Sequence, residues 1–169
     1  EAAIQNLNAE LEERVAERTM QLNDIKNRIE SILNSTADAI IYSRIDGTIE
    51  QVNPAFTETF GYQPDEIWQE ALNKLVIADE VATLERTFVN VLNTRQTQHM
   101  DATICRSDGT TFDASVMLAP VMENGDQMVG IVASIHDITS RNHMLHHAMS
   151  LSELKSRYVS MAAHDLRNP

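Results

Sequence analysis

The fold of this chain is decided around residues 53–66, NPAFTETFGYQPDE. Asn53 can cap a helix because its side-chain oxygen accepts a hydrogen bond from the first turn, and Pro54 suits the first helical position because that residue needs no N–H. We expect this helix to end near Gly61. On either side of it the pattern of apolar residues changes from helical to strand-like.

Two short β-type runs, residues 38–44 and 48–52, precede the helix and join at Asp46-Gly47, a dipeptide typical of tight hairpins. Short helical pieces continue to about residue 75, and an amphipathic helix is predicted over 78–94. Strands are then predicted over 97–106, 111–120 and 128–138, with turns at Asp108-Gly109 and at residues 124–126. This order predicts an α+β domain with a five-stranded antiparallel sheet and helices packed on one face.

Long helices are predicted on both sides of that domain. Residues 1–35 lack Gly and Pro, and their large apolar residues recur every three or four positions, which is typical of a coiled-coil seam with a polar gap at Arg18. This first seam comprises Ile4, Leu7, Leu11, Val15, Leu22, Ile25, Ile29 and Ile32. A second seam comprises Leu151, Leu154, Tyr158 and Met161. We expect a parallel homodimer; the alternative is a single amphipathic helix lying on its own domain.

The sequence thus divides into a coiled-coil helix (1–35), a globular domain (36–139) and a second helical segment (140–169).

Of the net charge of −12, residues 36–139 carry −11, so binding to nucleic acid is not expected. No apolar run approaches the ~20 residues of a membrane span, so we expect no membrane contact in these residues and a cytoplasmic location. The chain begins without Met inside a helical repeat and stops at Pro169. We therefore expect it to be part of a longer protein. Any attachment of that protein to a membrane is expected to be made by other segments.

Five strings in this order resemble PAS domains, over about residues 27–140. They are Asn53-Pro54-Ala55-Phe56, Phe60-Gly61-Tyr62, Pro64-Asp65-Glu66, Arg106-Ser107-Asp108-Gly109 and Asp137-Ile138-Thr139, the last matching the family's exit signature. The resemblance implies that the outer face of the sheet contacts a flanking helix or a dimer partner. Candidates to line a sensory cavity are Phe56, Phe60, Leu72, Leu75, Leu84, Phe88, Ile104, Val116, Leu118, Ile131 and Ala133, although a plain core has the same composition.

No cofactor is identified from the sequence. The flavin branch of the family carries a cysteine in an Asn-Cys-Arg string of the central helices, whereas the single cysteine here, Cys105, is expected on a strand. The haem branch uses a histidine of the long helix, and residues 78–94 contain none. Covalent flavin and haem are therefore disfavoured. No metal site is expected, because the histidines at 99, 136, 143, 146 and 147 lack Asp, Glu or Cys at ligand spacing. We expect the last three on a solvated helix face and Trp68 half-buried.

The final six residues, HDLRNP (164–169), resemble the H-box of histidine kinases, on the helix that serves dimerisation and phosphotransfer. The resemblance implies a two-component sensor histidine kinase in which His164 accepts the phosphoryl group. Asp165 then serves as orienter or general base, and Asn168 helps to place water for dephosphorylation. A neutral imidazole is a competent nucleophile near neutral pH. The 169 residues contain five glycines and no glycine-rich nucleotide box, so we expect ATP to enter only through an ATP-binding domain of the same protein, with a response regulator as further partner.

We therefore predict a sensory and signal-relay part of a histidine kinase, inactive alone, that passes a stimulus through paired helices to His164. The alternative is a ligand-free dimerisation and spacer domain that relays a signal from upstream. A third possibility is a different output, such as a nucleotide cyclase or a DNA-binding domain, against which the H-box argues.

Overall fold

The protein is described by a computed structural model that covers the backbone of residues 1–165 and the side chains of residues 1–157. Its helices are α1 (Ala2–Ser35), α2 (Pro54–Phe60), α3 (Pro64–Ile67), η1 (Leu72–Leu75), η2 (Ala78–Glu80), α4 (Val81–Thr94) and α5 (Thr139–Asp165). Its strands are β1 (Ala39–Ser43), β2 (Ile49–Val52), β3 (Gln98–Cys105), β4 (Thr111–Glu123) and β5 (Gln127–Asp137). The predicted order of two strands, several helices and three strands is confirmed, and Cys105 lies on a strand as expected.

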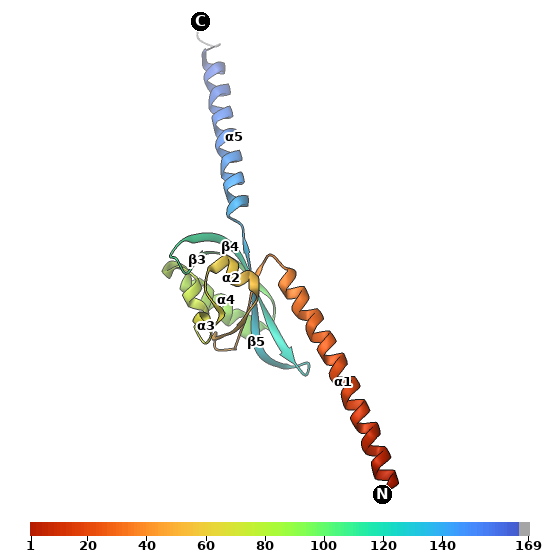
Figure 1. Cartoon of the computed structure of the whole chain (residues 1–169). Helices are drawn as coiled ribbons and strands as arrows, with labels where there is room; N and C mark the ends of the chain where they lie inside the picture. The colour runs from red at the N-terminus through yellow and green to blue at the C-terminus, as the bar shows by residue number, and fades with distance from the viewer. Residues whose placement is uncertain (166–169) are drawn as a thin grey trace.

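The sheet has the strand order β2-β1-β5-β4-β3, and every neighbouring pair is antiparallel. The first strand and the last strand therefore lie side by side in the middle, with Ala39 opposite Ile135. The chain enters the sheet at the same end of this strand pair at which it leaves. As a result, α1 ends close to the start of α5, although the two helices point away from the domain in opposite directions (Figure 1).

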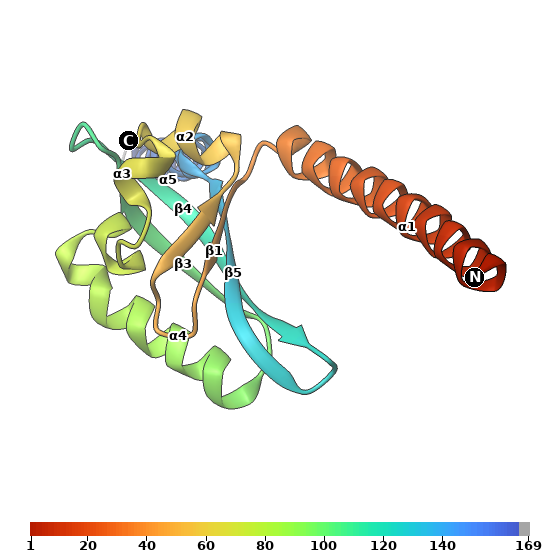
Figure 2. The ribbon, with the colours of Figure 1, turned by 60° about the horizontal axis from the view of Figure 1, so that its bottom comes forward.

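All the short helices and α4 cover one face of the sheet, as Figure 2 shows. The core between them is apolar because the strands alternate buried and less buried residues, so that one face of each strand points inward. At its centre Phe56 stacks on Phe60 at a centroid distance of 4.5 Å, and Phe112 meets Phe60 edge-on at 5.7 Å. These aromatic contacts join α2 to β4.

Helix α2 begins and ends as the sequence predicts. The side chain of Asn53 accepts a hydrogen bond from the backbone N–H of Phe56 at 3.0 Å. Gly61 adopts a left-handed conformation with φ of 76°, and its N–H donates to the carbonyl of Thr57. A Cβ at this position would stand 2.6 Å from Oγ of Ser107, so glycine is required by the neighbouring turn as well as by the backbone conformation.

Both Asp-Gly turns use the aspartate in the same way. Asp46 accepts a hydrogen bond from the backbone N–H of Thr48, and Asp108 accepts from both the hydroxyl and the backbone N–H of Thr110. These bonds stabilise the ionised carboxylate, and they lower the pKa of Asp46 and of Asp108 below the ordinary value. The turn residues are thus selected for local hydrogen bonding as well as for backbone shape.

Strand β4 is longer than predicted. We expected it to end at Pro120, but it continues to Glu123, although proline cannot donate to a strand ladder. Its pairing explains the difference. Strand β3 accompanies β4 only as far as Leu118, whereas β5 pairs with it to the end, with Pro120 opposite Ile131. Pro120 therefore lies where β4 has an open edge, a position at which proline is tolerated.

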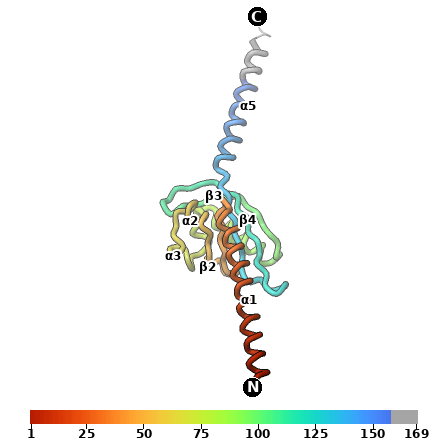
Figure 3. The backbone as a smooth tube through the Cα atoms, turned by 45° about the vertical axis from the view of Figure 1, so that its right-hand side comes forward, coloured from red at the N-terminus to blue at the C-terminus, as the bar shows by residue number. Residues whose placement is uncertain are grey.

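Helix α1 extends away from the globular domain in Figure 2 and contains no buried residue. Figure 3 shows its N-terminal half beyond the end of the domain opposite to α5. In this single chain, α1 therefore does not pack on its own domain along most of its length. The side chains of the first seam remain exposed, from 52% at Ile29 to 67% at Leu22. Of the helices in the described part of the chain, none combines the length and apolar character needed to cross a membrane.

Candidate functional site

The candidate site is the junction at which α1 joins β1 and β5 joins α5. Asp38 lies three residues after the end of α1, and His136 lies three residues before the start of α5. Nδ1 of His136 is 2.6 Å from Oδ1 of Asp38, so a side-chain contact links the segment after α1 to the end of β5. Because β1 and β5 are neighbours, both helices are attached to the same end of the central strand pair.

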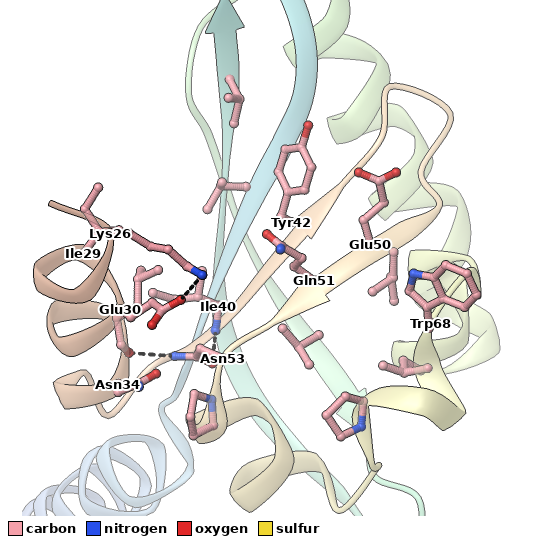
Figure 4. Close-up of a pocket in the computed structure, with 18 of the residues that line it drawn as sticks. Lys26, Ile29, Glu30, Asn34, Ile40, Tyr42, Glu50, Gln51, Asn53 and Trp68 are labelled. Carbon is pink, nitrogen blue, oxygen red and sulfur yellow. Dashed lines mark hydrogen bonds and ion pairs between the residues drawn. The ribbon is translucent and has the colours of Figure 1, made fainter. Parts of the chain in front are cut away.

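Asn53 is the buried centre of the first connection, with only 7% of its surface exposed. Its Oδ1 accepts hydrogen bonds from the backbone N–H groups of Ile40 and Phe56, at 2.9 and 3.0 Å. Its amide group donates to the carbonyl oxygens of Leu33 and Asp38, at 3.2 and 3.0 Å. One side chain thus holds the last turn of α1, strand β1 and the start of α2 together, as Figure 4 shows in part.

The second connection is built around Asp113 of β4. Its carbonyl oxygen accepts from the N–H of Ile138 at 2.9 Å, and its carboxylate accepts from the side chain of Asn142 at 3.0 Å. The hydroxyl of Thr139 accepts from the N–H of Asp113 at 3.2 Å. These three bonds tie the first turn of α5 directly to the sheet.

Arg106 extends this connection to the helical layer. Its Nε donates to the carbonyl of Thr59 in α2 at 2.8 Å, and its guanidinium lies 4.2 Å from the ring centroid of Phe112. The same guanidinium is 3.6 Å from the carboxylate of Asp137, which in turn accepts from the N–H of Thr139 at 2.9 Å. A planar group with several donors suits such a position, because it can stack and hydrogen-bond at once.

The inner side of the sheet offers little free space. A void of about 20 Å³ lies there, lined by seven of the candidate cavity residues together with Val76, Met100, Ala102 and Ile135. Those seven are Leu72, Leu75, Leu84, Ile104, Val116, Leu118 and Ala133. The remaining candidates lie elsewhere: Phe56, Phe60 and Ile131 are buried core residues outside the lining, and Phe88 is partly buried against the core. A void of this size has room for about one water molecule.

A much larger cleft, of about 1050 Å³, lies on the other side of the sheet, between α1 and the outer faces of β1 and β2. One wall is formed by the C-terminal half of α1, including Leu22, Ile25 and Ile29, with the Lys26–Glu30 ion pair at its rim (Figure 4). The other wall includes Ile40 and Tyr42 of β1. No part of the sequence pattern predicted this cleft, because it depends on the angle at which α1 leaves the sheet.

Trp68 is more exposed than predicted. It was expected to be half-buried; it is 58% exposed and lines the outer cleft, and the residue after it, Gln69, has a positive φ of 63°. Gly130 of β5 lies beneath Tyr42, where an added Cβ would stand 2.5 Å from the tyrosine ring. The glycine therefore allows Tyr42 to lie flat against the sheet and donate its hydroxyl to the carbonyl of Val129 at 3.3 Å.

Comparison with known proteins identifies the domain. Residues 27–138 match the family described as the PAS fold. The chain belongs to the PAS family. The match covers the end of α1, the whole sheet and its helices, and it stops where Asp137 and Ile138 lead into α5. The junction lies within the matched residues except for Thr139 and Asn142, which belong to the first turn of α5.

Solved structures agree in fold at low sequence identity. A PAS domain from Colwellia psychrerythraea has a TM-score of 0.64 at 19% identity, with 69% of this chain and 98% of that chain covered. A PAS domain of an HTR-like protein from Haloarcula marismortui gives 0.64 at 21% identity, covering 73% and 99%. A domain of a sensory box sensor histidine kinase/response regulator from Geobacter sulfurreducens gives 0.59 at 16% identity, covering 69% and 96%. No curated protein matches the sequence.

The cysteine of the flavin-binding PAS branch and the histidine of the haem-binding branch have no counterpart at the corresponding places in the described residues. Cys105 lies at the end of β3 rather than in the helical layer, and α4 contains no histidine. Within the described residues of this single chain, no group of three or more His, Cys, Asp or Glu is arranged to hold a metal ion.

The predicted phosphoacceptor region follows the PAS domain on α5. His164 and Asp165 belong to the last turn of that helix, and their side chains lie outside the described part of the chain. Asn168 lies wholly outside it. Residues that the sequence analysis did not single out are instead prominent at the junction: Asp38, Asp113 and Asn142. Each is an ordinary polar residue in the sequence, and only strand pairing brings it to its partner.

Proposed function

We propose that this PAS domain relays a signal from α1 to α5 and thereby to the phosphoacceptor His164 of a two-component histidine kinase. The observation that carries the proposal is the junction, where Asn53, the Asp38–His136 contact and Asp113 connect both helices to the same end of β1 and β5. A rotation or shift of α1 acts there on the start of α5 without first deforming the core. One solved structure with this fold is a domain of a sensor histidine kinase/response regulator.

The relay works in a parallel homodimer. The first seam exposes eight large apolar side chains along α1. A continuous apolar surface of this kind is typical of a site that another protein surface covers. Leu22, Ile25 and Ile29 belong to this seam and also line the outer cleft. A partner helix that packs on the seam therefore occupies the cleft and contacts β1 as well. Parallel pairing places both His164 residues at the same end of the dimer.

The chemistry at His164 is transfer of the γ-phosphoryl group of ATP. One ring nitrogen attacks the γ-phosphorus, the bond to the bridging oxygen breaks, and ADP leaves. Asp165 orients the imidazole or accepts its proton, and Asn168 helps to place the water that removes a phosphoryl group by hydrolysis in the separate dephosphorylation reaction. The ATP-binding domain of the same protein supplies the nucleotide, and a response regulator receives the phosphoryl group, which places the relay in the cytoplasm.

A mixed-dimer experiment tests the phosphoacceptor. The 169-residue chain is incubated with labelled ATP and with the full-length protein carrying His164→Gln, which retains its ATP-binding domain but has no acceptor. The chain should gain label that is lost in acid and stable in alkali. The chain with His164→Gln should remain unlabelled, whereas the chain with His146→Gln, a matched change on the same helix, should be labelled normally. Label in the His164→Gln chain would show that another residue is the acceptor.

A ligand-free relay is the second candidate, and the inner void of about 20 Å³ favours it over direct sensing. In this form the PAS domain passes on a signal from an upstream domain and binds nothing itself. Native mass spectrometry of freshly purified protein distinguishes the two. A mass equal to that of the polypeptide supports the ligand-free relay, and a bound small molecule supports direct sensing.

A further inference from the structure

Three histidines near the start of α5 have no role in the phosphotransfer chemistry. His143, His146 and His147 are all exposed on the helix that begins at Thr139. In an α-helix, residues four positions apart lie one turn apart on the same face, so the rings of His143 and His147 can reach a common point. Two histidines at this spacing on one helix are a recurrent way of holding a transition metal.

The heptad pattern of the second seam gives the position of His147 relative to a partner helix. Leu151 and Leu154 begin the seam in the described part of α5, and one heptad earlier the same two positions are Met144 and His147. Met144, Leu151 and Leu154 are exposed by 68%, 55% and 50%, as expected of a seam whose partner is a second copy. In the parallel dimer His147 then lies opposite His147 of the other chain. His143 flanks the seam one turn earlier, whereas His146 points away from the partner.

We propose that His143 and His147 of two chains together form a binding site for Zn²⁺ or a similar transition-metal ion. This inference rests on the parallel homodimer of the proposed function. A single chain offers two imidazoles, too few for a closed site, which agrees with the finding that its described residues hold no group of three ligands. Two chains offer four imidazoles, the number that a tetrahedral Zn²⁺ site requires, and imidazole is a ligand suited to Zn²⁺, Cu²⁺ and Ni²⁺.

The surroundings are compatible with a cation. Between residues 139 and 157 the one acidic residue of α5 is Glu153, six positions beyond His147 and nearly two turns away, so no carboxylate of that segment competes for the imidazoles. A bound ion would join the two α5 helices about one turn after they leave the PAS domain. It would fix their register at the start of the path to His164.

Titration of the purified 169-residue chain with zinc chloride tests the site. All variants carry His164→Gln, so that the proposed phosphoacceptor cannot supply a ligand. Isothermal calorimetry and native mass spectrometry should show one Zn²⁺ for every two chains. His147→Ala and His143→Ala should each weaken binding at least tenfold, whereas His146→Ala, the matched control, should leave it unchanged. Circular dichroism checks that the helices persist in each variant.

Light scattering on the same samples tests the metal site separately from the parallel dimer on which it depends. A chain that is dimeric and takes up no Zn²⁺, or binds one ion per chain, or binds equally well after His147→Ala, overturns the metal site and leaves the relay intact. A chain that stays monomeric with and without Zn²⁺ overturns both the parallel dimer and the site that depends on it.

Discussion

Oδ1 of Asp38 and Nδ1 of His136 lie 2.6 Å apart, although 98 residues separate them in the chain. Asp38 follows α1 and His136 lies near the end of β5, just before α5, so this contact joins the chain at the two points where the helices meet the sheet. Both side chains are partly exposed, 39% for Asp38 and 62% for His136. The contact is thus placed to couple the helices while adding little to the stability of the fold.

We predict a coupling of about 1 kcal/mol or less between these side chains, the range for exposed ion pairs. Asp38→Ala, His136→Ala and the double variant, unfolded in urea, measure it as a double-mutant cycle. Amide exchange should nevertheless become faster at residues 36–38 and 138–142. The exposed Glu70–Lys74 pair provides a control cycle that leaves these amides unchanged. Unchanged exchange at both segments in the double variant would argue against a coupling role.

For Asn53 we predict a large loss of stability. Asn53→Ala removes the α2 cap and the hydrogen bonds from this side chain to the part-buried backbone groups of Ile40 and Asp38, which should cost about 2–4 kcal/mol. The control Asn73→Ala removes one exposed hydrogen bond, to Glu85, and should change the free energy of unfolding by about 0.5 kcal/mol or less. Chemical denaturation measures both values.

Asn53→Asp separates the two roles of the side chain. The aspartate keeps an oxygen for the N–H groups of Ile40 and Phe56 but cannot donate to Leu33 and Asp38. We expect the domain to stay folded while amide exchange and proteolysis increase between residues 33 and 38. If that segment were as protected as in the original chain, Asn53 would not be what holds α1.

Arg106→Lys should destabilise the exit from the sheet. Lysine retains the positive charge but cannot both donate to Thr59 and stack on Phe112 in the planar geometry of arginine. We expect a loss of about 1–2 kcal/mol in thermal unfolding. Amide exchange should rise around Asp137 and Thr139. Arg95→Lys, whose partner Asp126 is 97% exposed, is the matched control and should have little effect on either measurement.

The dimer should depend on the residues shared by the first seam and the outer cleft. Ile25→Asp combined with Ile29→Asp places charges where apolar contact is expected, and because burial of each isoleucine contributes about 1.5–3 kcal/mol, dimer dissociation should increase at least 100-fold. Asn27→Asp adds a charge to α1 at a residue outside the seam and the cleft lining, and should leave the dimer intact. Sedimentation equilibrium measures both.

The orientation of the dimer has its own measurement. A chain with Cys105→Ser and Ala3→Cys carries one spin label near the start of α1. Parallel helices, each ~10 Å across, place the two labels within about 20 Å, whereas antiparallel pairing along α1 separates them by about 45 Å. A distance near the larger value would contradict the relay, because the two His164 residues would no longer lie at the same end.

In the proposed full-length histidine kinase, helix phase should control the output. Inserting one alanine after Ala148 rotates the rest of α5 by about 100° relative to the PAS domain, whereas seven alanines nearly restore the phase at 3.6 residues per turn. We expect autophosphorylation at His164 to change sharply with one alanine and to stay near the original level with seven. Equal activity in the two variants, or equal disruption, would exclude a relay through helix register.

Most of the fold could be predicted from the sequence because its signals are local. The cap at Asn53, the Asp-Gly turns and the alternation along the strands each act within a few residues of themselves. Strand β4 shows where local reasoning fails. Whether Pro120 ends a strand depends on which strands pair with β4 at that point. That pairing cannot be predicted from the residues next to Pro120.

The junction could be predicted only in part, for the same physical reason. The sequence by itself determined that Asn53 caps α2, that Asp137-Ile138-Thr139 leads out of a PAS domain and that a helix follows. Only the tertiary structure decided that β1 and β5 lie side by side, and this pairing brings Asp38 to His136 and the amide of Asn53 to Leu33. Contacts between distant segments depend on the register of the sheet, whereas caps and turns depend on the residues next to them.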